Sequence, residues 1–397
     1  MTQSPPMRRP LAHLGGPLEI RGDRKLGELL AEAHRAAASE DRDTLTHGFH
    51  AYPARMHPAI PYVLVKELTG DRGTVLDPFS GSGTVAIEAM VAGREAHGVD
   101  LNPLAVRLAR VKCQLRDTDS LYGFLRTLRE LGDRSEERVR ARVASRAPIP
   151  PEEVRHYEGH TLKELAGLRE EILTVEDPRD REAFLLLLSA IVVKFSKQKA
   201  DTSEGHVPKR IRKGLPTEFF VRKGEELAER WHQLRAAVPP HVREARIVEG
   251  DVRNLRHALP RGFHADLVLT SPPYGGTYDY VQHHARRYPW LGIDAADFDR
   301  GEIGARRRSQ GPGAVERWDR ETRGTLQSIA DVLSRNGMAI LLVGDGDVAG
   351  QRIDAADHLA ELAPSAGLRA IAAASEERPD FTGKADRREH LVALAKA

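Results

Sequence analysis

The stretch Gly73-Thr74-Val75-Leu76-Asp77-Pro78-Phe79-Ser80-Gly81-Ser82-Gly83-Thr84 decides the fold of this chain. Its first four residues predict a short buried strand, its glycines predict a turn, and the apolar run 85–92 predicts a helix that ends at Gly93. A strand, a glycine-rich turn and a helix bring a ligand against bare backbone and a helix N-terminus. The stretch therefore predicts a ligand site at the end of a strand of an α/β sheet.

Three kinds of ligand fit such a turn. A phosphate-binding loop needs a Gly-Lys-Ser/Thr sequence, and the turn contains no lysine. A dinucleotide fingerprint needs Gly-x-Gly-x-x-Gly, which Gly81, Gly83 and Ala86 fit only loosely. The third is a nucleoside without a phosphate, for which the carboxylate of Asp77 is useful because it favours a nearby cation.

The next strand favours a nucleoside. Residues 95–100 read as a second strand that ends in Asp100, followed by Leu101-Asn102-Pro103 and a helix over 104–113. An acid at the tip of the second strand of a βαβ unit is placed to accept hydrogen bonds from both hydroxyls of a ribose. A plain strand-end aspartate is the alternative interpretation.

A second turn carries a different signal. The apolar run 265–270 stops at Ser271-Pro272-Pro273-Tyr274. Because proline lacks an N–H and fixes φ near −65°, the chain leaves the sheet here as a stiff, extended turn. Its serine and its aromatic ring can bond and stack on a flat heterocycle. An ordinary strand exit is the bland alternative for this turn taken alone.

Composition limits the class of protein. The 397 residues are 40% hydrophobic and 30% charged, which is typical of a soluble globular chain, and no run is long and apolar enough for a bilayer. The N-terminus lacks the apolar core of a signal peptide, so we expect a cytoplasmic protein. The single cysteine, Cys113, excludes a disulfide framework. Lys and Arg number 60 against 58 acids, a net charge of +2, so affinity for nucleic acid must come from local patches.

These motifs together resemble the S-adenosylmethionine-dependent DNA methyltransferases that modify exocyclic amino groups. The resemblance rests on 77–84, on Val99-Asp100-Leu101-Asn102-Pro103, on 271–274, and on His50-Ala51-Tyr52-Pro53-Ala54 upstream. It implies S-adenosylmethionine as the cofactor, held by Tyr52, Asp77, Phe79, Gly81, Gly83, Thr84, Asp100, Asn102 and Asp251, with Asp251 at the adenine amino group. It implies that Ser271, Pro272, Pro273 and Tyr274 hold the target base. No metal is expected, since the histidines at 47, 50 and 57 have no carboxylate or cysteine interleaved at ligand spacing.

The expected fold is a doubly wound, mostly parallel, seven-stranded α/β methyltransferase sheet with an inserted helical domain. Residues 1–44 are expected to form an N-terminal arm and helix, with 1–24 a loose arm. Residues 45–114 and 245–397 form the catalytic domain. The helical insertion 115–244 interrupts the sheet between its second and third strands, and we interpret it as a DNA target-recognition domain.

Basic residues in two places suggest contacts with nucleic acid. From Lys194 to Lys223 nine basic residues face three acids, namely Asp201, Glu204 and Glu218. A second cluster, Arg306-Arg307-Arg308, lies in a glycine-rich loop. Such patches suit phosphate contacts, although solvated surfaces are often basic as well. The residues predicted to bind nucleic acid are Lys197, Lys199, Lys209, Arg210, Arg212, Lys213, Arg306 and Arg307.

The predicted reaction is methylation of an exocyclic amine on a base flipped out of duplex DNA. Methylation at carbon 5 of cytosine is disfavoured, because it needs a nucleophilic cysteine beside the fourth strand and Cys113 comes well before it. Within the family a leading serine, here Ser271, leans toward cytosine N4, whereas Asp or Asn is commoner for adenine N6. An N6-adenine enzyme, an RNA amino-methyltransferase and a cofactor-binding regulator stay open as alternatives. The resemblance implies duplex DNA as the partner, allows a cognate restriction endonuclease in the same system, and fits a monomer or a homodimer.

Overall fold

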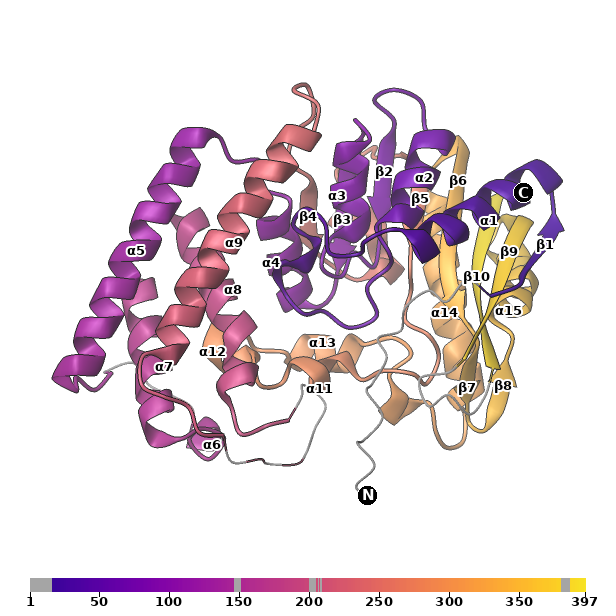
Figure 1. The fold of residues 1–397 in the computed structure, drawn as a ribbon. Coiled ribbons are helices and arrows are strands. Elements are labelled where there is room, and N and C mark those ends of the chain that lie inside the picture. The colour runs from indigo at the N-terminus through magenta and orange to yellow at the C-terminus, as the bar shows by residue number, and fades with distance from the viewer. Residues whose placement is uncertain (1–15, 146–150, 200–204, 206, 208, 380–385) are drawn as a thin grey trace, which may run out of the picture.

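A single eight-stranded sheet organises the computed structural model, which describes residues 16–145, 151–199, 205, 207, 209–379 and 386–397. The strand order is β1-β9-β10-β6-β5-β2-β3-β4 (Figure 1). These strands are β1 (Leu18–Gly22), β2 (Thr74–Asp77), β3 (Glu95–Asp100), β4 (Arg246–Glu249), β5 (Ala265–Thr270), β6 (Leu333–Gly344), β9 (Leu368–Pro379) and β10 (Asp386–Lys396). The predicted α/β class is therefore confirmed.

The middle of the sheet is parallel and its far edge is not. Strands β4, β3, β2, β5 and β6 pair in parallel, whereas β10 is antiparallel to both β6 and β9. Parallel strands place their carboxyl ends at one edge of the sheet, so Asp77, Asp100 and Thr270 meet there. A small second sheet pairs β7 (Gly346–Val348) with β8 (Gln351–Ile353).

Helices cover both faces of the sheet. One apolar core joins the sheet to α1 (Arg24–Ser39), α2 (Ala59–Leu68), α3 (Thr84–Val91) and α4 (Pro103–Lys112). A second core, on the other face, joins it to α10 (Leu255–Ala258), α14 (Ala314–Val332) and α15 (Ala355–Leu362). The near-continuous apolar sequence of β5 fits burial on both faces.

The N-terminal segment differs from the prediction. Residues 18–22, predicted to be part of a loose arm, form β1, which pairs antiparallel with β9 from Leu18↔Glu376 to Gly22↔Ala372 and adds an eighth strand to the seven predicted. Helix α1 packs Leu30 and Ala33 into the same core as the sheet, so 18–39 belong to this layer rather than to a separate arm. Residues 1–15 of the predicted arm lie outside the described residues.

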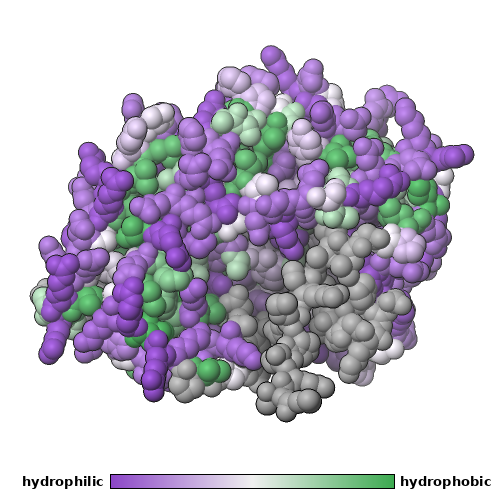
Figure 2. Space-filling model, in the orientation of Figure 1, coloured by the Kyte–Doolittle hydropathy of each residue, from purple (hydrophilic) through white to green (hydrophobic). Residues whose placement is uncertain are grey.

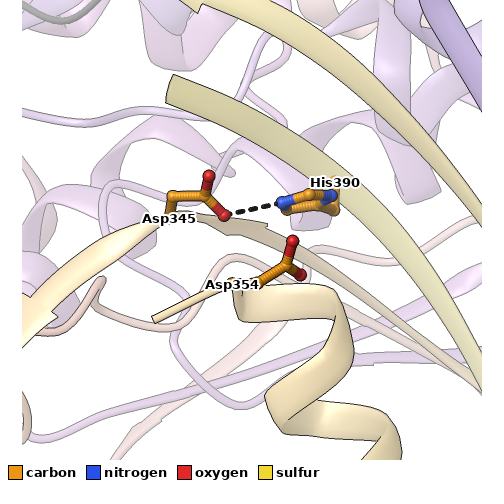
Figure 3. A group of neighbouring side chains, drawn as sticks. All are labelled: Asp345, Asp354 and His390. Carbon is orange, nitrogen blue, oxygen red and sulfur yellow. Dashed lines mark hydrogen bonds and ion pairs between the residues drawn. The ribbon is translucent and has the colours of Figure 1, made fainter. Parts of the chain in front are cut away.

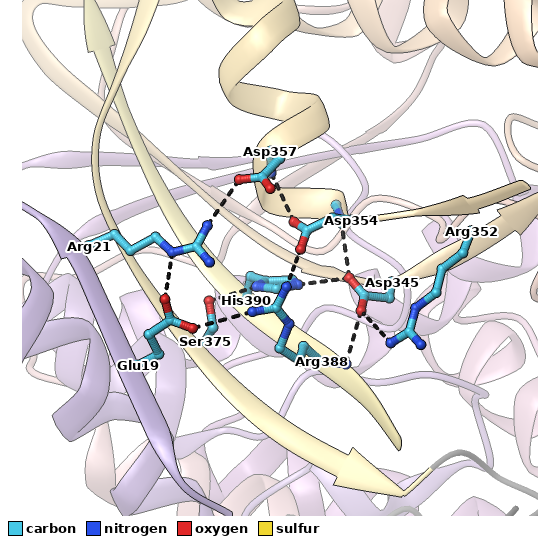
Figure 4. A network of polar contacts seen from close by, with 10 residues as sticks. Glu19, Arg21, Asp345, Arg352, Asp354, Asp357, Ser375, Arg388 and His390 are labelled. Carbon is cyan, nitrogen blue, oxygen red and sulfur yellow. Dashed lines mark hydrogen bonds and ion pairs between the residues drawn. The ribbon is translucent and has the colours of Figure 1, made fainter. Parts of the chain in front are cut away.

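An ion-pair network ties β1 to its neighbours (Figure 4). Arg21 bonds Glu19 at 2.8 Å and Asp357 of α15 at 3.0 Å, and Arg388 of β10 bonds Glu19 at 3.3 Å. The strand alternates apolar Leu18 and Ile20 with these charges, as expected where one face is buried. Exposed pairs of this kind add little stability each, and the register of β1 follows from the apolar side that it buries.

The insertion forms a helical body beside the sheet, on the left in Figure 1. It consists of α5 (Thr118–Ala141), α6 (Pro151–Val154), α7 (Gly159–Leu173), α8 (Pro178–Phe195) and α9 (Leu215–Ala237). Its apolar core also includes Leu104, Leu108 and Val111 of α4, so it packs directly against the sheet domain.

On the face shown in Figure 2, hydrophilic side chains surround small separate groups of apolar residues. None of the described helices is long and apolar enough to cross a membrane.

The segment between β5 and α14 runs below the sheet in Figure 1. It contains three short helices, α11 (Tyr280–His284), α12 (Tyr288–Leu291) and α13 (Ala296–Gly301). Trp290 and Leu291 pack into the core of the helical body, while Phe298 turns toward the carboxyl edge of the sheet. This segment therefore closes the space between the two parts of the molecule.

Candidate active site

A cavity of about 840 Å³ opens at the carboxyl edge of the sheet, and we call it the central cavity. Most of the residues predicted to bind the cofactor line it. They are Tyr52, Asp77, Phe79, Gly81, Thr84, Asp100, Asn102 and Asp251. Ser271 and Pro273 of the Pro-Pro turn line it as well. Residues from five separate segments thus meet at one place.

The glycine-rich turn wraps around the end of β2. Gly81 has φ +48°, and a Cβ there would lie 3.2 Å from the ring of Tyr52. Gly83 has φ +88° and precedes α3, but it does not line the cavity. A Cβ on Gly83 would lie 3.0 Å from that of Ala109, so this glycine allows α3 and α4 to approach each other. Gly83 therefore has a packing role in this structure, and its contact with the cofactor stays a prediction.

Asp77 joins the two key turns. Its Oδ1 accepts hydrogen bonds from Thr270 Oγ1 at 2.6 Å and from the N–H of Phe79 at 3.1 Å. Thr270 directly precedes Ser271, so this bond fixes the Pro-Pro turn relative to the glycine-rich turn. Burial raises the pKa of Asp77 to about 7. A cation placed beside Asp77 would favour its ionised form.

Asp100 is held ready for hydroxyl donors. Its Oδ2 accepts from the N–H of Gly81 at 2.7 Å, and its Oδ1 accepts from the N–H of Asn102 at 2.8 Å. Each carboxylate oxygen keeps a second lone pair, which leaves room for two further donors. Burial raises the pKa of Asp100 to about 6, while the two N–H groups oppose that rise. The geometry suits a ribose diol, as the position of this acid at the strand tip predicts.

Asp251 is already engaged by a cation. Arg253 donates from Nε to Oδ1 at 2.9 Å, and its own N–H also bonds Oδ1 at 2.9 Å. Although burial opposes it, the bond from Arg253 lowers the pKa of Asp251. The carboxylate is thus ionised and oriented, but most of its hydrogen-bonding capacity is used within the protein.

Aromatic residues close the cavity on one side. Tyr52 stacks on His284, with ring centroids 5.1 Å apart, and on Tyr280 at 6.3 Å. Asn102 caps α4 by accepting from the N–H of Leu104 at 3.0 Å, and its amide reaches Tyr52 Oη at 3.5 Å. The upstream loop and the segment below the sheet therefore form one aromatic wall.

Hydroxyls in the glycine-rich turn lack partners in the protein. Ser80 Oγ and Thr84 Oγ1 are buried without a hydrogen bond to any described residue, although both residues line the central cavity. A buried polar atom without a partner is costly, so these hydroxyls fit a polar ligand in this cavity. These two hydroxyls and the Asp100 carboxylate are suitable hydrogen-bond partners for a nucleoside that carries an amino-acid tail.

A second cavity, of about 1220 Å³, lies on the other side of Ser271, and we call it the arginine-rich cavity. Its wall contains Ser271, Tyr274 and Tyr278 and the cations Arg42, Arg55, Arg378, Arg387 and Arg388. Ser271 and residues 54–56 line both cavities. Ser271 therefore lies in the wall between the central cavity and a cavity lined by five arginines.

Tyr274 is anchored from the antiparallel edge of the sheet. Its hydroxyl donates to Glu389 Oε1 of β10 at 3.0 Å, and a Cβ on Gly344 would come within 2.6 Å of its ring. Glu389 in turn pairs with Arg378 at 2.6 Å. Pro272 lies behind the turn, in a third cavity that it shares with Pro273 and Tyr274. The four residues of the turn thus differ in what they face.

The predicted nucleic-acid residues divide into two sets. Arg307 bonds Asp279 at 3.0 Å, Asp299 at 2.7 Å and Glu302 at 2.6 Å, so its charge is paired within the loop, and its phosphate contact stays a prediction. Arg212 pairs with Glu218 at 2.5 Å, Lys197 with Glu158 at 3.5 Å, and Lys209 bonds two backbone carbonyls. The side chains of Lys199, Arg210, Lys213 and Arg306 are exposed and form no ion pair with the described residues. Asp201 and Glu204, counted in the same patch, lie outside the described residues.

One group of side chains has the composition of a metal site. Asp345, Asp354 and His390 bring ligand atoms within 4.8 Å of one another (Figure 3). Each is already paired, since His390 Nε2 bonds Asp345 at 3.0 Å, Arg352 bonds Asp345 at 3.3 Å, and Arg388 bonds Asp354. Burial opposes it, but the bond to His390 lowers the pKa of Asp345. The group is part of the ion-pair network of Figure 4.

The histidines at 47, 50 and 57 bond separate partners, Glu88, Ser189 and the carbonyl of Glu40.

Several residues of the site were missed by the sequence reasoning. Ser80, Ser82 and Arg55 stand inside or beside the quoted motifs, where they could have been included. Tyr280, Phe298 and Glu302 come from the irregular segment below the sheet, and no spacing pattern marks them.

Comparison with known proteins agrees with this geometry. Residues 24–111, from the start of α1 to the end of α4, match the DNA methylase family. The Type II methyltransferase M.MvaI of Kocuria varians is 37% identical over 71 residues, which cover 17% of this chain and 16% of that protein. M.MjaII of Methanocaldococcus jannaschii is 30% identical over 88 residues, 22% and 17% of the two chains, and M.BsoBI of Geobacillus stearothermophilus is 24% identical over 277 residues, 62% and 53%. The matched parts thus span about half or less of these relatives.

The resemblance to the DNA amino-methyltransferase family is confirmed by these matches. S-adenosylmethionine is confirmed with it as the cofactor. The matched segment contains Tyr52, the glycine-rich turn and Asp100, which line the central cavity.

Proposed function

We propose that this protein is a DNA methyltransferase that transfers a methyl group from S-adenosylmethionine to the N4 amine of a flipped-out cytosine. The observation that carries the proposal is the position of Ser271, which lines both the central cavity and the arginine-rich cavity. A methyl donor in the first cavity and a base in the second would meet at this residue. Such proximity and alignment supply much of the rate acceleration in group transfer.

The turn has the groups that an amine acceptor needs. An exocyclic amine on a base is a poor nucleophile, because its lone pair is delocalised into the ring. Two acceptors that bond both amino hydrogens favour a pyramidal nitrogen, and we assign the Ser271 hydroxyl and the Pro272 carbonyl to this role, with Tyr274 against the base. The bound cofactor supplies an electrophilic methyl group on its sulfonium. No strong base is required, since the proton becomes acidic after the nitrogen has attacked.

Duplex DNA is the proposed substrate. The description of the matched family as DNA methylases and the names of the Type II relatives support DNA, and they make a cognate restriction endonuclease a reasonable partner. The arginine-rich cavity supports a polyanion through Arg42 and Arg387, which line it and form no ion pair with the described residues. Its other arginines, Arg55, Arg378 and Arg388, are already paired with acids. We keep the insertion 115–244 as the target-recognition domain, with Lys199, Arg210, Lys213 and Arg306 as the exposed cations for phosphate contact. The oligomeric state proposed is a monomer or a homodimer, and the location is the cytoplasm.

The preference for cytosine rests on Ser271. A serine hydroxyl is short and can accept one amino hydrogen, and a leading serine in this turn leans toward cytosine in the family, whereas Asp or Asn leans toward adenine. N6-adenine methylation is the alternative within the family. An RNA amino-methyltransferase is the alternative outside it, because the same core and the same turn would serve an RNA base.

The test is to express the protein in a host without other modification and digest its DNA to nucleosides. N4-methylcytosine in wild-type DNA, lost in the Ser271→Ala variant but retained in a Ser365→Ala control in the 3-10 turn after α15, where the serine is exposed, is the expected result. N6-methyladenine without N4-methylcytosine would refute the cytosine assignment. Methyl incorporation into tRNA or rRNA but not into duplex DNA would refute the DNA assignment. Unchanged turnover in Ser271→Ala would refute the role of the serine.

A further inference from the structure

Lys112 is a buried cation without a counter-charge. It is the last residue of α4, its exposed fraction is 0%, and it forms no ion pair with any described residue. Its Nζ donates to Ser82 Oγ at 3.2 Å, the one side-chain hydrogen bond that its ammonium makes among those residues. Arg116, 4% exposed, differs because it pairs with Asp180. Burying an ammonium without an opposite charge costs several kcal/mol, so such a group calls for an explanation.

The surroundings of Lys112 add positive rather than negative charge. Burial and, to a smaller extent, the nearby Arg55 together lower the pKa of Lys112 to about 7. Arg55 is itself paired with Asp43 at 2.6 Å. His47, whose charge would interact with that of Lys112, is hydrogen-bonded to Glu88 at 2.6 Å. The acids of this region are therefore engaged with other groups.

The one partner of Lys112 faces the central cavity. Ser82 lines that cavity and lies in the glycine-rich turn, two residues before Thr84 and the N-terminus of α3. Because Ser82 Oγ accepts from Lys112, its own O–H must point to another acceptor. The first N–H groups of α3 also favour an anion at this end of the cavity. Thr84 Oγ1, unpartnered among the described residues, lies at the same place.

We propose that Lys112, acting through Ser82, positions the carboxylate of the methionine part of S-adenosylmethionine. This rests on the proposed function only in its choice of cofactor. The sulfonium and the ammonium of that cofactor are cations, so its carboxylate is the group that the buried ammonium attracts. Asp100, at the ribose end, and Lys112, at the carboxylate end, then fix the direction in which the cofactor lies. Lys112 touches neither the methyl group nor the base and is a positioning residue.

The test compares two ligands that differ by one group. Decarboxylated S-adenosylmethionine lacks only the carboxylate, so its binding should be insensitive to Lys112. We expect Lys112→Met to weaken binding of S-adenosylmethionine by about tenfold or more in calorimetric titration, because a charge-assisted contact is lost. The affinity for the decarboxylated ligand should change by less than about twofold, because this ligand has no carboxylate for Lys112 to contact in either protein. Ser82→Ala should show the same selectivity, and Lys66→Met, an exposed lysine on α2, should change neither ligand.

The outcomes separate the two proposals. Equal weakening for both ligands, or no weakening for either, would overturn the role of Lys112 even if the protein methylates DNA. Selective weakening together with methylation of RNA rather than DNA would support Lys112 and refute the proposed substrate. A wild-type protein that binds neither ligand would overturn both proposals. Since Lys112→Met could alter folding, its melting temperature is measured, and Lys112→Arg, which keeps the charge, should recover part of the selectivity.

Discussion

Several charged side chains around the central cavity lack an ion-pair partner, whereas arginines in the basic loops are paired. Around the cavity, Asp77 and Lys112 are buried and Asp100 is half-buried, and none of the three has an ion-pair partner among the described residues. In the loops, Arg307 and Arg212 lie nearer to solvent and are each paired with carboxylates. Unpaired charge is costly where water is excluded and cheap where water is present. The unpaired buried charges therefore identify a ligand site more reliably than the number of basic residues identifies a nucleic-acid surface.

The sharpest test of the cavity is Asp100→Ala. The change removes the acceptor for the N–H groups of Gly81 and Asn102 and the proposed acceptor for the ribose. Hydrogen bonds to a charged group contribute about 1.5–3 kcal/mol each, so cofactor affinity should fall by about 100-fold or more in calorimetric titration. Glu249→Ala, at the exposed end of the next strand, is the matched control and should leave affinity unchanged. A loss below about threefold for Asp100→Ala would mean that this acid does not hold the ligand.

Two adjacent arginines test the loops. Arg307→Gln leaves the buried Glu302 without its cation, so we expect the free energy of unfolding to fall by about 2 kcal/mol, less than for a fully buried pair because Arg307 is partly exposed. Arg306→Gln removes an exposed, unpaired cation and should change stability by less than about 0.5 kcal/mol. Denaturant titration measures both. Equal stability losses in the two variants would contradict the distinction between paired and unpaired cations.

Asp77→Asn tests whether the buried charge carries a cost in the ligand-free protein. The folded pKa of about 7 exceeds the ordinary value near 3.8, so the folded protein binds this proton more tightly than the unfolded chain does. Stability from this group is then present at low pH and is lost as the pH rises through about 4 to 7. Asparagine keeps the acceptor for Thr270 and never ionises, so the variant should be more stable than wild type at pH 8, by up to about 4 kcal/mol at about 1.4 kcal/mol for each unit of pKa shift. The gap should close by about pH 4, as followed by denaturant titration, and a gap independent of pH would contradict the raised pKa.

The regular elements were predictable because their apolar spacing is local. The helix predicted over 104–113 is α4, Pro103–Lys112, and the insertion falls between the second and third strands of the parallel set as expected. Strand β1 was missed because its five residues are too few to mark a strand by themselves, and its pairing partner β9 lies about 350 residues later in the sequence. The ion pairs of Arg307 were not predicted, because Asp279, 28 residues earlier, and the nearer Asp299 and Glu302 converge on it only in the folded loop. The number of basic residues in a stretch of sequence does not show which of them will pair with acids in the folded protein.

The smallest expected effects concern the exposed cations, and they decide which surface the nucleic acid occupies. If Lys213 contacts a phosphate, Lys213→Gln should lower the slope of log affinity against log salt concentration by about 0.9, since each contact releases about one counterion. Arg212→Gln, the adjacent cation already paired with Glu218, should leave the slope nearly unchanged. Arg42→Gln, at the rim of the arginine-rich cavity, offers the same measurement at the other candidate surface. Fluorescence anisotropy with labelled duplex at several salt concentrations measures all three. A smaller slope for Arg42→Gln alone would place the nucleic acid at the cavity beside Ser271 rather than at the insertion. Equal decreases in slope for Arg212→Gln and Lys213→Gln would show that ion pairing within the protein does not remove a cation from the binding surface.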